Sequence, residues 1–287
     1  MTVVGRSERF RTGKGSVRIA PNAVVGDGGL VVFAGPCALE SRELALEVGS
    51  EVHRACAALG LPYVFKTSFD KANRTSVGSF RSIGFARALA ILADLRETIG
   101  VPVMTDVHET NQVATVAGVA DVLQIPAFLC RQTDLLVAAG STGRTVNIKK
   151  GQFMAAGDMR YAVAKVRSAG SSGVLLTERG STFGYHDLVV DFRSLAIMRR
   201  FAPVVFDATH SVQSPGGGLG RSGGHRQFVA PLARAAVAFG VDAIFLETHP
   251  DPEAALSDGP SMVPLADVER LLRDCRAIHE LRKPVKA

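Results

Sequence analysis

Four side chains that can bind a divalent metal follow or end strand-like segments far apart in the sequence: Cys37, His210, Glu247 and Asp258. One thiolate, one imidazole and two carboxylates can together hold a catalytic metal and leave room for water or substrate. A buried cysteine is also commonly a small apolar residue, and a lone histidine near a strand is commonly structural. The metal interpretation therefore requires all four side chains to meet at one face of the fold.

A second set of residues suits anionic ligands. The segment 66–76, KTSFDKANRTS, offers three cations with hydroxyl and amide donors, and Lys149, Lys150 and Arg179 add cations at other strand ends. Lysine supplies a point charge and arginine a planar fork, which suit phosphate and carboxylate groups. A solvated basic loop would have the same composition as 66–76, but two separate basic regions favour a ligand or ligand pair with two phosphate groups.

The elements that must position these residues alternate between short apolar runs and helical patterns. Strands are predicted near 30–36, 63–68, 101–106, 121–126, 145–150, 173–178, 203–208 and 242–247, with helices between them, for instance 41–59, 83–99, 155–168, 226–239 and 264–281. Eight such β/α units predict an α/β fold, a (β/α)8 TIM barrel, although an open doubly wound sheet is the alternative. In a barrel the working groups lie at the carboxyl ends of the strands, where the polar clusters of this sequence fall.

The 287 residues match the length of one large barrel, so we expect a single domain over 1–287. The segment 1–29 is predicted as an N-terminal extension, with a small hairpin within 3–21 that closes the N-terminal end of the barrel. The glycine-rich segment 216–224 lacks the Lys-Ser/Thr pair of a nucleotide-binding loop and is interpreted as a lid. No GxGxxG joins a predicted strand directly to a helix, which disfavours NAD.

The composition narrows the class of protein. Hydrophobic residues make up 47% and charged residues 21%, without an apolar run that could cross a membrane and without a secretory signal, so we expect a cytoplasmic protein. Four cysteines without CxxC spacing argue against a disulfide framework and a structural zinc cluster. The net charge of +6 is not concentrated in one tail or helix, which favours small anionic substrates over nucleic acid.

Long motifs, in order, resemble those of the 3-deoxy-D-manno-octulosonate 8-phosphate synthase (Kdo-8-phosphate synthase) family. They are AGPCALES at 34–41, FKTSFDKANRTS at 65–76, LQIPAFLCRQTDLL at 123–136, NIKKGQFM at 147–154, LTERGSTFGYHDLVVDFRSL at 176–195, FDATHSVQSPGG at 206–217, FLETHP at 245–250 and SDGPS at 257–261. The resemblance implies a barrel transferase, usually a homotetramer, that condenses phosphoenolpyruvate with D-arabinose 5-phosphate and releases inorganic phosphate. Its product would feed lipopolysaccharide synthesis in a bacterium, or a cell-wall polysaccharide in a plant.

The resemblance also implies roles for individual residues. Phosphoenolpyruvate would be held by Lys71, Gln124, Lys149 and Arg179. The pentose phosphate path would be lined by Lys66, Ser68, Asn73, Arg74 and Ser76, with Asp106 nearby, and Arg131 would reach the sugar phosphate of a neighbouring subunit. The implied catalytic residues are Lys71, Asp106 and His210.

The residue after Gly35-Pro36 distinguishes the two branches of this family. Cysteine marks the metal-dependent branch and asparagine marks the other, so Cys37 with the THSVQ run at 209–213 resembles the metal-dependent branch. The implied ligands are Cys37, His210, Glu247 and Asp258. This donor set accepts iron, zinc, manganese, cobalt or cadmium and leaves the native ion open.

Two alternatives remain at this stage. A 3-deoxy-D-arabino-heptulosonate 7-phosphate synthase shares the barrel and the donor but takes a four-carbon aldose phosphate, and it typically carries Lys-Pro-Arg-Thr where this chain has Lys71-Ala72-Asn73-Arg74. The extra Asn73 favours the pentose acceptor. A non-catalytic barrel that binds sugar phosphates would bind these ligands without releasing phosphate.

Overall fold

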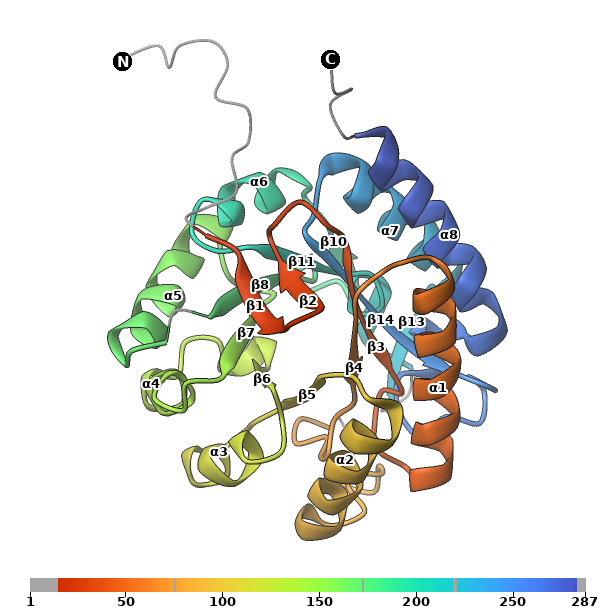
Figure 1. Ribbon diagram of the computed structural model, residues 1–287, viewed down its shortest axis with the longest axis horizontal. Coiled ribbons are helices and arrows are strands. Elements are labelled where there is room, and N and C mark those ends of the chain that lie inside the picture. Colours follow the sequence, from red (N-terminus) through yellow and green to blue (C-terminus); the bar gives the residue numbers. More distant parts are fainter. Residues whose placement is uncertain (1–14, 75, 172, 219–220, 283–287) are drawn as a thin grey trace.

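Eight parallel strands close into a barrel in the computed structural model, which describes residues 15–74, 76–171, 173–218 and 221–282 (Figure 1). They are β3 (Val31–Gly35), β4 (Tyr63–Lys66), β5 (Val103–Asp106), β6 (Val122–Ile125), β7 (Thr145–Lys149), β8 (Val174–Glu178), β11 (Val204–Asp207) and β14 (Ala243–His249). Neighbours in this order pair in parallel, and β14 pairs with both β11 and β3, which closes the ring. The barrel prediction is confirmed, and the open-sheet alternative is wrong.

Helices form the outer layer around these strands (Figure 1). They are α1 (Arg42–Ala58), α2 (Phe85–Ile99), α3 (Thr110–Ala117), α4 (Thr133–Gly140), α5 (Met159–Ser168), α6 (Arg193–Arg199), α7 (Val229–Phe239) and α8 (Leu265–Leu281). Helix α1 begins where the Ser41 hydroxyl accepts a hydrogen bond from the Leu44 amide at 3.1 Å, a side-chain cap. Its buried face includes Val48 and Val52, which pack into the main core between helices and strands.

A two-stranded hairpin closes one end of the barrel. Strands β1 (Val17–Ala20) and β2 (Ala23–Val25) pair antiparallel, and the side chains of Val17 and Val25 join the apolar cluster inside the barrel, which includes Phe33 and Phe245. A hairpin at this end of the barrel was predicted within 3–21, and the structure has one at 17–25, so the prediction of a hairpin is confirmed but only the first strand lies in the predicted segment. Residues 3–14 of that segment lie outside the described residues.

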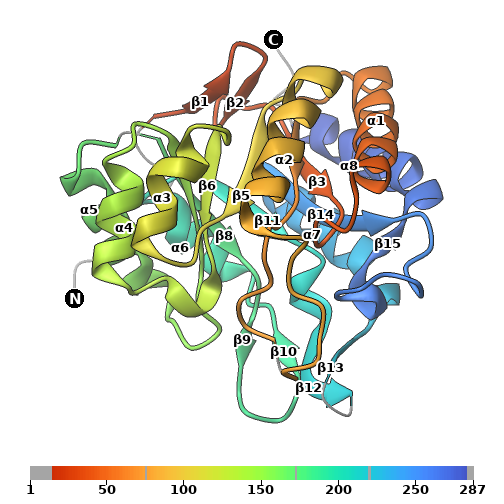
Figure 2. The ribbon, with the colours of Figure 1, turned by 90° about the horizontal axis from the view of Figure 1, so that it is seen from below.

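The opposite end of the barrel carries the longer loops (Figure 2). Strands β9 (Ser181–Thr182) and β10 (Leu188–Val189) form one hairpin there, and β12 (Gln213–Gly218) and β13 (Arg221–Gly224) form a second. The glycine-rich segment predicted as a lid contributes to this second hairpin, with 219–220 outside the described residues. A short strand, β15 (Val263–Pro264), pairs with the end of β14. Within the described part of the chain, we find no helix with the length and apolar character needed to span a membrane.

Candidate active site

The strand register brings the predicted site residues to one end of the barrel. Glu247 lies opposite Gly35 in the β14–β3 pair, and Asp106 lies opposite Gln124 in the β5–β6 pair. Gly35 permits this arrangement, because a Cβ atom there would lie 2.1 Å from the carbonyl oxygen of Lys66. The close approach of β3 and β4 sets the position of Cys37 two residues later.

Three of the four predicted metal ligands form one cluster. Cys37, Glu247 and Asp258 each offer a ligand atom within 4.8 Å of the other two. The Cys37 thiol donates to Asp258 Oδ2 and to Ser257 Oγ, both at 3.1 Å. The Ser257 hydroxyl also donates to Asp258 Oδ2, at 3.0 Å. A sulfur donor from the segment after β3, a carboxylate from β14 and a carboxylate from the segment before β15 form a donor set that suits a borderline divalent metal.

His210 lies beside this cluster, with its two ring nitrogens facing different carboxylates. Nδ1 is 2.8 Å from Asp207 Oδ2, and Nε2 is 3.6 Å from Glu247 Oε2. Glu247 Oε2 is buried and accepts no hydrogen bond from the described residues. A carboxylate that fixes one nitrogen while the other faces a donor cluster is the usual arrangement of a metal-binding histidine. The four residues therefore fit a metal, although the imidazole is not within the three-residue cluster itself.

Two buried lysines flank the same carboxylates. Lys66 Nζ lies 3.1 Å from Glu247 Oε1, and Lys149 Nζ lies 2.5 Å from Asp207 Oδ2. Both ammonium groups also lie over the ring of Phe245, at 5.1 and 4.5 Å from its centroid. The aromatic face and the carboxylates together stabilise two buried cations at short range.

Arg179 adds a third cation with an unused donor. Its Nη2 donates to Gln213 Oε1 at 2.7 Å, whereas its buried Nη1 has no hydrogen-bond partner within the described residues. A buried guanidinium nitrogen without a partner is costly unless a ligand supplies an acceptor. Arg179 is therefore suited to bind an anion.

The pKa shifts separate the thiol from the carboxylates. Burial raises the pKa of the Cys37 thiol well above its usual value, and the charge of Glu247 adds to this effect. Burial alone would also raise the pKa of Glu247, but His210 and Lys66 outweigh it and hold the pKa below its usual range. Burial lowers the pKa of Lys149, and Asp207 opposes that shift. Metal binding at Cys37 would therefore release a proton.

The other predicted substrate residues lie at different depths. Lys71 Nζ donates to Ser68 Oγ at 3.0 Å, the buried Gln124 amide oxygen accepts from Asn147 at 3.4 Å, and Asp106 Oδ2 is 2.9 Å from His108 Nε2. Arg74 donates to the carbonyl oxygens of Phe80 and Leu256. Asn73, Ser76 and Arg131 are exposed.

Some residues that organise the site were not singled out by sequence reasoning. Asp207 contacts both Lys149 and His210, and Gln213 contacts both Arg179 and Asp258. Lys150, expected among the ligand cations, instead donates to the carbonyl oxygen of Gly180 at 3.1 Å and lies 3.4 Å from Glu178 Oε1. Asp207 lies at the end of β11, and both Asp207 and Gln213 fall within the FDATHSVQSPGG run at 206–217, which are the sequence signals for these two residues.

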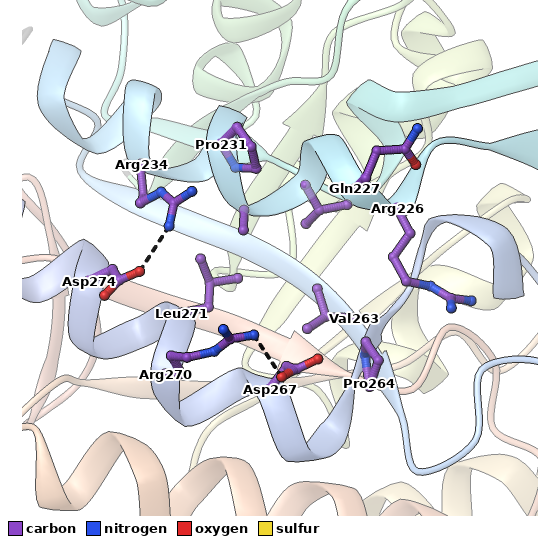
Figure 3. Close-up of a pocket in the computed structure, with 12 residues that line it drawn as sticks. Arg226, Gln227, Pro231, Arg234, Val263, Pro264, Asp267, Arg270, Leu271 and Asp274 are labelled. Atoms are coloured by element: carbon purple, nitrogen blue, oxygen red, sulfur yellow. Dashed lines mark hydrogen bonds and ion pairs between the residues drawn. The ribbon is translucent and has the colours of Figure 1, made fainter.

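A separate groove of about 490 Å³ runs between α7 and α8 on the outer layer (Figure 3). Its arginines are paired, since Arg234 lies 2.9 Å from Asp274 and Arg270 lies 2.9 Å from Asp267. Its lining contains none of the predicted site residues. We therefore locate the chemistry at the barrel mouth, where the cations and the metal donors converge.

The fold and the site define a (β/α)8 barrel protein that collects buried cations next to a thiolate and carboxylate cluster. A family model described as DAHP synthetase I family matches residues 11–283, and the chain belongs to this family. Curated relatives named 2-dehydro-3-deoxyphosphooctonate aldolase include those of Synechococcus sp., Rhodopseudomonas palustris and Granulibacter bethesdensis. They are 56%, 58% and 54% identical, over 92%, 92% and 96% of this chain and 94%, 96% and 99% of their own lengths.

Proposed function

We propose that this protein condenses phosphoenolpyruvate with D-arabinose 5-phosphate and water to give 3-deoxy-D-manno-octulosonate 8-phosphate and inorganic phosphate. The main support is that two cations, Lys149 and Arg179, lie at the same end of the barrel as the metal donors Cys37, Glu247 and Asp258. The curated relatives compared above also share one name. That name refers to the product of this condensation. The same relatives favour it over the heptulosonate synthase, although the matching family model carries the broader description.

The buried cations would hold the donor substrate. Arg179 Nη1, which has no partner within the described residues, can donate a hydrogen bond to an anionic oxygen of the substrate. Lys149 Nζ lies 3.2 Å from His210 Nδ1 at the edge of the donor cluster. Lys71 and Gln124 complete the proposed phosphoenolpyruvate site. Positive charges held in a buried site bring two mutually repelling phosphorylated substrates into contact range.

The acceptor would enter along the loop after β4. Lys66, Ser68, Asn73, Arg74 and Ser76 line its proposed path, with Asp106 nearby. The enol C3 of phosphoenolpyruvate forms a bond to the aldehyde carbon of the sugar, and water adds at C2. Cleavage of the C2–O bond then expels phosphate and leaves a ketone. Asp106 is the group proposed to exchange protons with the aldehyde oxygen and the water, whereas His210 would act in catalysis as a metal ligand, since its Nε2 faces Glu247 of the donor cluster.

Cys37, His210, Glu247 and Asp258 would hold one divalent ion. When bound, this ion supplies a Lewis acid for polarising the aldehyde oxygen and orienting water. The donor set is compatible with iron, zinc, manganese, cobalt or cadmium. Lys66 contributes by pairing with Glu247, which fixes the orientation of that carboxylate.

The test is a substrate comparison. Purified protein with added divalent metal should release inorganic phosphate from phosphoenolpyruvate when D-arabinose 5-phosphate is present, and much more slowly with erythrose 4-phosphate. A preference for the four-carbon sugar would overturn the choice of acceptor. Binding of both ligands without phosphate release would favour the non-catalytic alternative.

We further propose a homotetramer in which Arg131 completes the site of a neighbouring subunit. The exposure of Arg131 supports this, because an arginine that faces outward from its own barrel is available to a neighbouring one. Sedimentation analysis of the purified protein would test the assembly.

A further inference from the structure

We propose that Gln213 is a positioning residue that couples the anion site at Arg179 to the metal cluster at Asp258. This inference rests on the proposed function, since it assigns an anionic donor substrate to Arg179 and a divalent ion to Asp258. It predicts that each ligand strengthens the binding of the other through one amide side chain.

The geometry consists of two short hydrogen bonds on opposite ends of the amide. Arg179 Nη2 donates to Gln213 Oε1 at 2.7 Å, and Gln213 Nε2 donates to Asp258 Oδ1 at 2.7 Å. An amide carries an acceptor and a donor in one rigid plane. The opposite orientation would place N–H groups against the guanidinium and oxygen against the carboxylate, so the two charged partners determine which end is which.

The connection continues into the metal donors. Asp258 Oδ1 is held by Gln213, while Oδ2 accepts from the Cys37 thiol and the Ser257 hydroxyl. The backbone of Asp258 has φ of 51°, in the left-handed region. Aspartate adopts this region more readily than most residues other than glycine. The Asp258 carboxylate is oriented by the three side chains that donate to it, and Gln213 is one of them.

On the Arg179 side of Gln213, the hydrogen-bonded chain ends at a guanidinium nitrogen that can still donate a hydrogen bond. Arg179 uses Nη2 for Gln213, while its buried Nη1 has no hydrogen-bond partner within the described residues. An anion bound at Nη1 would fix the guanidinium without displacing Gln213. A fixed guanidinium in turn holds the amide and the Asp258 carboxylate in one arrangement. The first ligand to bind bears the entropy cost of ordering these side chains, so the second ligand binds more tightly, which is positive coupling.

A merely structural role is the competing interpretation. Gln213 is buried and begins β12, where it pairs with Gly224 of β13. If Gln213 only supports this hairpin, its substitution would lower stability but would leave the effect of one ligand on the other unchanged. Coupling between the ligands is therefore the measurement that separates the two roles.

The experiment titrates Co²⁺ into the metal-free full chain, with and without phosphoenolpyruvate, and follows the thiolate-to-cobalt charge-transfer absorbance. In the wild type, phosphoenolpyruvate should tighten Co²⁺ binding by about 5-fold or more, the usual scale of such coupling. Gln213→Met keeps the shape but loses both hydrogen bonds. It should weaken Co²⁺ alone by roughly 10-fold, as expected for loss of a ligand-orienting contact, and reduce the coupling factor to below about 2.

Two further variants keep the test decisive. Gln213→Asn retains the amide but is one methylene too short to reach both partners, so it should also lose coupling. It replaces Gln213→Met in the test if that variant does not fold. Ser214→Ala is the matched control. It removes the neighbouring hydroxyl, which lies 3.3 Å from His225 Nε2, and should keep the wild-type coupling factor.

The proposal is overturned if a folded Gln213 variant keeps the wild-type coupling factor, or if the wild type shows no coupling or fails to bind either ligand. The measurement requires no turnover. A wild type that shows the coupling but releases no phosphate with either sugar would overturn the proposed function and leave this inference standing.

Discussion

Lys66 and Glu247 form a buried ion pair, with 3.1 Å between Nζ and Oε1. The lysine ends β4, next to the proposed acceptor loop, and the glutamate belongs to the metal donor cluster on β14. The proposed acceptor path and metal cluster are thus parts of one site. Breaking a buried pair leaves an uncompensated charge. Substitution of either Lys66 or Glu247 should therefore weaken both acceptor binding and metal binding.

Replacement of the Cys37 thiol should remove metal and activity together. Cys37→Ala deletes one of the three donors that lie within 4.8 Å of one another. We expect the metal content after purification and the rate of phosphate release to fall in parallel, each by about 10-fold or more. Metal analysis and a phosphate assay on the same preparation measure the two quantities. Cys275→Ala serves as the control, because its buried thiol lies in α8.

The metal role can be contradicted directly. Activity that survives thorough chelation in Cys37→Ala would show that the ion is unnecessary. Cys37→Asn introduces the residue of the metal-independent branch. We expect it to bind metal more weakly and to depend less on added metal than the wild type.

Lys150 should stabilise the fold by compensating the buried Glu178. Burial raises the pKa of Glu178, and Lys150 is the leading opposing charge. In Lys150→Met the carboxylate is buried without its cation, so we expect a loss of about 3–5 kcal/mol near neutral pH. The pKa of Glu178, already above its usual value in the folded wild type, would rise further in the variant. Stability should therefore fall more steeply than in the wild type as pH rises from the unfolded pKa to the folded one.

Chemical denaturation at several pH values measures this effect. The double variant Lys150→Met with Glu178→Gln should recover most of the loss, because the uncompensated charge is gone. It should also lack the pH dependence of the single variant. Equal stability of the single and double variants would contradict the assignment.

The positions of strands and of strand-end residues were predictable from the sequence, whereas contacts across the barrel were not. Near-continuous apolar runs such as 243–246 indicate a buried strand, and the polar residue that follows falls at the barrel mouth, as Glu247 does. The contact of Asp207 with Lys149 joins two different strands, and the role of Gln213 depends on residues 34 and 45 positions away. Such partners carry no spacing signal, because the barrel brings together segments that are remote in the chain.

Gly35 should be intolerant of any side chain. A Cβ there would lie 2.1 Å from the Lys66 carbonyl oxygen, a backbone atom that cannot move without separating β3 from β4. Overpacking of this kind typically costs about 1–3 kcal/mol. Gly35→Ala should therefore lower the unfolding free energy and displace Cys37, which weakens metal binding. Gly157→Ala is the control, since an added Cβ there meets nothing within 4 Å.

If Arg131 completes a neighbouring site, mixing two inactive variants should restore activity in part of the sites. Arg131→Ala subunits keep their own buried cations but donate no guanidinium, whereas Lys149→Ala subunits donate Arg131 but lack a cation that lies 2.5 Å from Asp207. Unfolding and refolding the two together produces mixed assemblies in which some Arg131→Ala sites regain the arginine from a Lys149→Ala neighbour. Phosphate release should then exceed the sum of the separately refolded variants by several-fold. If assemblies shown to contain both variants release phosphate no faster than the separate variants, Arg131 acts within its own subunit.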